Sequence, residues 1–296
     1  MSKNLFFVSN PNPGFLGIKA DKPKIDIYLL GVPFDSGVSW RPGTRFGPQA
    51  IREASLNIET FSYRYSFDAT NLRIEDLGDI SVVHGDSAET LRRVELTIKE
   101  IEKDAPLVLI GGEHTMTLAA VKALKPDFFV VFDAHTDLRD DYLGFRLSHA
   151  SVSRRISEII EPKNILQVGI RASCTEELEY ASKNRINILN SVWIHNNGLE
   201  ETKKVLKEKT SQANRIYVSV DLDVLDPSCM PGVGNPEAEG LTTHELITFL
   251  DSIVDKRLIG FDIMELNPLM DPSGISAVTA TRILLEVLIK SSISRT

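Results

Sequence analysis

The chain has 296 residues, of which 42% are hydrophobic and 25% charged, with a formal net charge of −8. This length can bury a large core, and the acidic balance argues against a nucleic-acid partner. The two cysteines, Cys174 and Cys229, lie far apart and form no Cys-x-x-Cys pair, which argues against a disulfide framework or a thiolate zinc site. The N-terminal apolar stretch is too short for a signal peptide, and no later run approaches the ~20 residues of a membrane helix. We therefore expect a soluble, cytoplasmic protein with one domain over residues 1–296.

The first part of the chain predicts two strands and two helices. A strand is expected over Lys24–Leu30, and Pro48 suits the first turn of a helix that follows a loop. A second strand is expected over Leu72–Leu77, closed by Gly78 and, from its charges, placed at an edge or an exposed face. Apolar residues at helical spacing over Ser87–Asp104 predict an amphipathic helix whose first residue is the N-cap.

From residue 107 onward, short apolar runs alternate with helical patterns. The expected strands are Leu107–Ile110, Phe128–Phe132, Ile165–Ile170, Ile186–Leu189, Ile216–Val220 and Leu258–Met264. Helices are expected between most of them, and a last helix over Ile275–Ile289. Apolar strands that alternate with helices predict a mainly parallel sheet covered on both faces, a three-layer αβα sandwich.

Three of the predicted strands end in side chains that bind metals. The motifs are Gly111-Gly112-Glu113-His114, Asp133-Ala134-His135-Thr136-Asp137 and Ser219-Val220-Asp221-Leu222-Asp223. Each motif alone is more often a cap or a turn than a ligand set. Together they can meet at the carboxyl edge of one sheet, where open α/β sheets bind ligands.

Four carboxylates at one edge would repel one another and raise one another's pKa unless cations compensated them. A metal pair is the simplest way to resolve that repulsion. Oxygen ligands with a minority of imidazoles favour Mn²⁺ or Mg²⁺, and the imidazoles favour Mn²⁺ of the two, with zinc, cobalt and nickel still open.

At these residues the chain resembles the ureohydrolases, the family of arginases and agmatinases. The resemblance runs from Gly47-Pro48-Gln49-Ala50-Ile51-Arg52 to Asp262-Ile263-Met264-Glu265-Leu266-Asn267-Pro268, nearly the whole chain, and its DAHxD and SxDxDxxDP motifs are highly specific. It implies two Mn²⁺ ions per subunit that share Asp133 and Asp221. One ion would be held by His114, Asp133, Asp137 and Asp221, and the other by His135, Asp133, Asp221 and Asp223.

The resemblance also implies the reaction, hydrolysis of a guanidino group to an amine and urea. Metal binding lowers the pKa of water enough to supply hydroxide at neutral pH, and Asp137 would orient that hydroxide. His149 matches the family's proton shuttle, a role suited to a side chain that titrates near neutrality. Glu265 matches the carboxylate that pairs with the guanidinium group. A homo-oligomer, a trimer or a hexamer, is implied as well.

Some positions depart from the family pattern. Ala150 follows His149 where the family has glycine, and Glu113 stands where the family often has aspartate. Glu239 replaces the first glycine of a usual pair, so the local turn is expected to differ. None of these departures removes a proposed ligand. His84, His195 and His244 have no partner motif and are expected to be surface or structural residues.

The substrate is less defined than the reaction. The segment between Asp137 and His149 looks like that of an agmatinase, and its Asp140-Asp141 pair suits a cationic tail, as in agmatine, although a solvated loop is an equal reading. Arg139 and Arg146 could instead bind a carboxylate, as an arginase, a guanidinobutyrase or a formimidoylglutamase would need. A non-catalytic guanidino- or polyamine-binding protein is the alternative outside catalysis. Agmatine hydrolysis, a step of polyamine biosynthesis, is the leading hypothesis.

Overall fold

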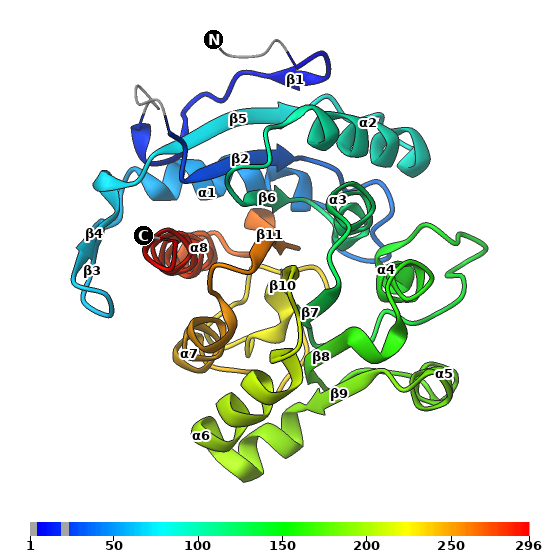
Figure 1. The fold of residues 1–296 in the computed structure, drawn as a ribbon. Coiled ribbons are helices and arrows are strands. Elements are labelled where there is room, and N and C mark those ends of the chain that lie inside the picture. Colours follow the sequence, from blue (N-terminus) through cyan, green and yellow to red (C-terminus); the bar gives the residue numbers. More distant parts are fainter. Residues whose placement is uncertain (1–4, 19–23, 296) are drawn as a thin grey trace.

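In the computed structural model, which describes residues 5–18 and 24–295, a nine-stranded sheet runs through the middle of the molecule (Figure 1). Its strands are β1 Val8–Ser9, β2 Ile27–Val32, β5 Ile74–Ile80, β6 Leu107–Gly111, β7 Phe128–Phe132, β8 Ile165–Ile170, β9 Asn187–Asn190, β10 Ile216–Asp221 and β11 Leu258–Met264. They lie in the order β1-β5-β2-β6-β11-β10-β7-β8-β9, and only the β1–β5 pair is antiparallel. The mainly parallel sheet expected from the sequence is confirmed.

Helices cover both faces of this sheet (Figure 1). One layer holds α2 Ser87–Glu100, α3 Thr117–Leu124, α4 Val152–Ile156 and α5 Thr175–Asn184; the other holds α1 Gly47–Ser55, α6 Ser191–Thr210, α7 Thr243–Ile253 and α8 Ile275–Ile293. A two-stranded hairpin, β3 Phe61–Ser62 with β4 Phe67–Asp68, lies outside the main sheet. Within the described residues, no helix is both long and apolar enough to cross a membrane.

Alternate residues of a central strand enter the two cores. In β7, Phe129 and Val131 pack in the core under α2 and α3, whereas Phe128, Val130 and Phe132 pack in the core under α7 and α8. Successive side chains of a strand point to opposite faces, so a strand covered on both sides must be apolar throughout. This explains the unbroken apolar run that precedes Asp133.

Several element boundaries differ from the sequence predictions by one to four residues, and two of these differences have a clear physical reason. Gly78 does not close the second strand, because β5 continues to Ile80. Asp76 pairs with Leu29 and Asp79 with Gly31, so an extra residue is inserted there, and Gly78 takes a positive φ of 97° that suits such a bulge. The N-cap of α2 is Asp86 rather than the residue that follows it, because its side chain accepts a hydrogen bond from a backbone amide of the first turn.

The order of the central strands brings the three motifs together. β6, β11, β10 and β7 are consecutive neighbours and run parallel, so their carboxyl ends share one edge. His114 follows β6, Glu265 follows β11, Asp221 ends β10, and Asp133 follows β7. Four segments that are far apart in the sequence therefore deliver polar side chains to one place.

Candidate active site

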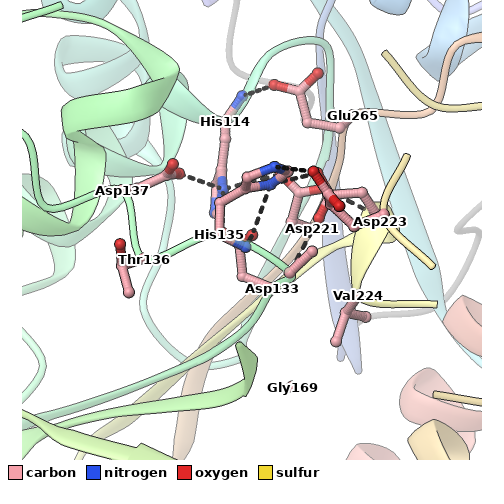
Figure 2. Close-up of polar contacts among 12 residues, drawn as sticks. His114, Asp133, His135, Thr136, Asp137, Gly169, Asp221, Asp223, Val224 and Glu265 are labelled. Atoms are coloured by element: carbon pink, nitrogen blue, oxygen red, sulfur yellow. Dashed lines mark hydrogen bonds and ion pairs between the residues drawn. The ribbon is translucent and has the colours of Figure 1, made fainter. Parts of the chain in front are cut away.

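The carboxyl edge holds two groups of ligand-type side chains that share one aspartate (Figure 2). The inner group is His114, Asp133 and Asp221, and all three are buried. His114 Nδ1 lies 3.1 Å from Asp221 Oδ2 and 3.3 Å from Asp133 Oδ2. Asp137 Oδ2 approaches the same nitrogen at 3.5 Å. Three carboxylates thus converge on one imidazole nitrogen.

The outer group is Asp133, His135 and Asp223. His135 Nδ1 lies 3.0 Å from Asp223 Oδ2 and 3.7 Å from Asp133 Oδ1, and its side chain is 27% exposed. Asp133 therefore presents one oxygen to each group. Backbone amides fix the carboxylates: Asp133 Oδ1 accepts from His135 N at 2.6 Å, and Asp221 Oδ1 accepts from Asp223 N at 2.9 Å.

The buried polar atoms of the inner group fit a metal ion. His114 Nδ1 and Asp133 Oδ2 are both buried and lack a hydrogen-bond partner within the described residues. Buried polar atoms are rarely left in that state without a reason. The ligand atoms in each group lie within 4.8 Å of one another, and the donors are carboxylate oxygens and imidazole nitrogens. Both groups can hold a divalent cation of the Mn²⁺ or Zn²⁺ type.

The pKa shifts of the clustered side chains also fit a metal site. Burial, aided by the charge of Asp133, raises the pKa of Asp137 to about 7. Burial and the neighbouring carboxylates also raise the pKa of Asp221 well above its usual value. Burial alone would lower the pKa of His114 and His135, but their aspartate partners outweigh it and raise both. The metal-free cluster therefore retains protons that a cation would displace.

A chain of hydroxyl groups orients His114 from behind. Its Nε2 lies 2.9 Å from Ser219 Oγ, and the Ser219 hydroxyl donates to the buried Asp262 carboxylate. Tyr217 and Thr117 donate to the same carboxylate at 2.7 and 2.8 Å. Because the Ser219 proton goes to Asp262, the serine oxygen accepts from Nε2–H, which leaves Nδ1 free as a ligand. Sequence reasoning missed this network; its only signal is a polar residue inside otherwise apolar strands.

Asp137 reaches the site by a turn rather than by strand periodicity. Its φ is +51°, so the extended conformation ends before it. Asp133 and His135 share a face as expected for residues two apart in a strand. The left-handed backbone then redirects Asp137 toward His114, as Figure 2 shows.

A cavity of about 320 Å³ opens above the two groups. His149 and Glu265, the two remaining predicted site residues, both line it together with Asp137. Glu265 Oε1 accepts from His114 N at 2.7 Å, and burial, with a contribution from Glu113, raises its pKa to about 8. Six of the eight predicted site residues therefore line this cavity, and the other two, His114 and Asp133, contact members of that set.

His149 is held by the loop after β2. Its Nε2 lies 3.1 Å from Ser39 Oγ. Burial lowers the pKa of His149, and a hydrogen bond with the Gly37 backbone opposes that shift. Gly37 N in turn donates to Glu113 Oε2 at 2.6 Å, and a side chain at Gly37 would meet the same carboxylate. Glu113, a departure from the family pattern, thus holds the loop that contacts His149.

The acidic pair between the ligands and His149 does not face the cavity, so its predicted role in binding a cationic tail is not supported. Asp140 pairs with Arg155 and Arg146, and Asp141 accepts from a backbone amide in its own turn. Arg146 is likewise engaged outside the site, whereas Arg139 does line the cavity. Of the four charged residues in this segment, only Arg139 therefore lines the cavity.

The other departures from the family pattern have local outcomes. Glu239 takes the positive φ itself, at +62°, so the turn keeps a left-handed residue without glycine. The three leftover histidines, His84, His195 and His244, are exposed, as expected.

A parallel α/β sheet that presents two ligand groups with a shared aspartate, under a cavity with a histidine and a glutamate, is the arrangement of a two-metal hydrolase. The Arginase family matches the chain over residues 25–290. The N(1)-aminopropylagmatine ureohydrolase of Thermococcus kodakarensis is 42% identical over 86% of this chain and 88% of its own length. The agmatinase of Bacillus subtilis is 36% identical over 93% and 95%.

Solved structures agree. The crystal structure of agmatine ureohydrolase from Thermoplasma volcanium superposes with a TM-score of 0.85 at 31% identity, covering 92% of each chain. The chain belongs to the arginase family, the ureohydrolases, whose members hydrolyse guanidino or amidine groups. The resemblance seen in the sequence motifs is confirmed, as is the three-layer fold.

Proposed function

We propose that this protein hydrolyses agmatine to putrescine and urea. The observation that carries the proposal is the pair of ligand groups that share Asp133 under a cavity lined by His149 and Glu265. The names of its relatives, agmatinase and agmatine ureohydrolase, favour this substrate among guanidino compounds. A guanidinium carbon is a poor electrophile because its charge is delocalised, so the reaction requires a strong nucleophile in a fixed position.

The proposed metals are two Mn²⁺ ions, supported by the mixture of carboxylate oxygens and imidazoles. His114, Asp133, Asp137 and Asp221 would hold one ion, and Asp133, His135 and Asp223 the other. The family resemblance adds Asp221 to the second set. When bound, the pair supplies a hydroxide nucleophile at neutral pH by lowering the pKa of water.

The side chains around the cavity then have separate tasks. Glu265 accepts hydrogen bonds from the guanidinium group and fixes its plane. Asp137 orients the attacking oxygen. His149 is held neutral by its lowered pKa, so it can accept a proton from the attacking water and return it to the departing amine nitrogen. A C–O bond forms, the C–N bond to the tail breaks, and the products are urea and putrescine.

The test is urea release by the purified protein supplied with Mn²⁺ and offered agmatine, arginine or 4-guanidinobutyrate in parallel. Agmatine should give the highest kcat/KM. If none of the three compounds yields urea, the proposed activity is wrong, and a guanidino-binding protein without activity would then be the better account.

N(1)-aminopropylagmatine is a second candidate substrate. Glu237, at the rim of the cavity, has a side chain that is 47% exposed, so the rim does not close over the end of a bound tail. A substituent on the distal nitrogen could therefore extend into solvent. The relative from Thermococcus kodakarensis carries that name.

We further propose that the protein works in the cytoplasm as a homo-oligomer. Two free cysteines support a reducing compartment, and the family resemblance supports a trimer or a hexamer. Size-exclusion chromatography with light scattering would measure the assembly.

A further inference from the structure

We propose that Glu237 binds the cationic end of the substrate and thereby selects guanidino compounds with a distal ammonium group over those with a neutral or anionic tail. This inference rests on the proposed function, because it concerns the same cavity. The choice of substrate tail would then depend on a residue at the rim of the cavity and not on the metal ligands.

Among the acidic groups that line the cavity, Glu237 differs from the others in its surroundings. Five carboxylates line it: Asp137, Asp221, Asp223, Glu265 and Glu237. The first three belong to the ligand cluster, and Glu265 is bound to the His114 backbone and faces the reacting group. Glu237 is the carboxylate left over, and a cationic tail needs an acceptor of that kind.

Glu237 lies where the tail has to leave the site. Its Oε1 is 4.0 Å from His135 Nε2, on the side of the imidazole opposite the nitrogen that faces Asp223. A guanidinium group placed between Glu265 and the ligand groups directs its alkyl chain toward the open side of the cavity. Glu237 and Trp40 both line the cavity and are both exposed, so they lie on its solvent side. Trp40 gives the methylene groups an apolar surface to cross.

The backbone that carries Glu237 is held rigidly by Arg171. This guanidinium donates to the carbonyl groups of Glu237 and Ala238 at 2.9 and 2.8 Å. It also donates to Asp223 O at 2.7 Å and Val224 O at 3.2 Å, in the segment that follows β10. The rim loop and the ligand loop are therefore fixed relative to each other, which places Glu237 before a substrate arrives.

The arginine of the cavity, Arg139, is partly neutralised by a neighbouring carboxylate. Arg139 lines the cavity, but its guanidinium lies 3.9 Å from the buried Glu177 carboxylate and over the ring of Tyr142. A substrate carboxylate would have to compete with Glu177 and would meet the negative charge of Glu237. Both effects disfavour tails such as that of 4-guanidinobutyrate.

The experiment compares three guanidino compounds of similar length whose tails end in an ammonium group, a methyl group or a carboxylate: agmatine, n-butylguanidine and 4-guanidinobutyrate. In the wild-type protein with Mn²⁺, kcat/KM should fall in that order. In Glu237→Gln, the KM for agmatine should rise roughly 2- to 10-fold with kcat little changed, since the negative charge that attracts the ammonium group is lost from a half-exposed site. The KM for n-butylguanidine should change by less than about twofold.

Glu239→Gln is the matched control, because it makes the same change of charge two residues away, in the same loop but outside the cavity. It should leave all three substrates unaffected, and the metal content of both variants should equal that of the wild type. An equal effect of Glu237→Gln on agmatine and n-butylguanidine, or no effect on either, would overturn the assignment while leaving the proposed activity intact. Absence of urea from every substrate would instead overturn the proposed activity.

Discussion

The inner and outer ligand groups share Asp133 but differ in their surroundings. Every member of the inner group is buried, and His114 is fixed from behind by Ser219 and Asp262. In the outer group, His135 is 27% exposed and its far nitrogen faces the rim of the cavity. On the proposed metal binding, this difference predicts a division of tasks, in which the inner group retains its cation and the outer group lies next to the substrate.

Removing the shared ligand should have the largest effect. Asp133→Ala takes an oxygen from both groups and leaves His114 and His135 without a common partner. We expect both metals to be lost and turnover to fall by roughly 10³-fold or more, since the metals supply several kcal/mol of transition-state stabilisation. Elemental analysis and urea assays would measure this. Asp140→Ala, outside the cavity, is the control; two metals retained in Asp133→Ala would show that the aspartate is not shared.

His149→Ala tests the chemistry that lies outside both groups. The imidazole lines the cavity but contacts Ser39 rather than a ligand. We expect kcat to fall roughly 10²- to 10⁴-fold, the usual contribution of a positioned acid–base group, with both metals still bound. Undiminished kcat across the pH range would exclude the shuttle role.

Ser219→Ala probes why the inner group retains its cation. The variant removes the hydroxyl group that contacts His114 Nε2 and links it to the Asp262 carboxylate. Loss of such an outer partner typically costs 10- to 100-fold in metal affinity, and the effect should fall on the inner ion alone. Competition with a chelator, followed by metal counting, would show it. Equal loss of metal from both groups would contradict the proposed difference between the inner and outer groups.

Metal affinity should also depend on pH. Burial and Asp133 raise the pKa of Asp137 to about 7, so in the metal-free protein this carboxyl group is protonated below that pH. A metal binds the ionised form, so affinity should rise with pH between 5.5 and 8, by about tenfold per pH unit for each proton released. The rise does not end at pH 7, because the aspartates also raise the pKa of His114 and His135, which must lose a proton to bind a metal. Titration with Mn²⁺ at pH 5.5 and pH 8 would measure it. A flat affinity across this interval would show that Asp137 is not a ligand.

The ligand positions could be predicted because they are local in sequence. Asp133 and Asp221 come at the ends of apolar strands, and parallel strands bring such ends to one edge. The contacts that orient the ligands from other segments of the chain had no such local signal in the sequence. The contact of Ser219 with Asp262 depends on the register of β10 against β11, which places the two residues side by side.

The direction in which loop charges point was the least predictable feature. Asp140 is only three residues from Asp137, yet it turns away to Arg155. Glu237 lies outside every ligand motif in the sequence but lines the cavity. Proximity in sequence says little about direction once a left-handed residue such as Asp137 has redirected the chain. Gly78 shows the same limit in a strand, where a glycine makes a bulge instead of a stop.

Arg171 holds the rim through carbonyl oxygens alone. Its guanidinium contacts six of them, in Gly169, Asp223, Val224, Leu225, Glu237 and Ala238. Every amino acid offers a carbonyl, so these hydrogen bonds do not require a glutamate at position 237, although the Glu237 charge acts favourably on the guanidinium. On the proposed role of Glu237, a substitution at this position would change the choice of guanidino compound while the ligand groups keep their positions.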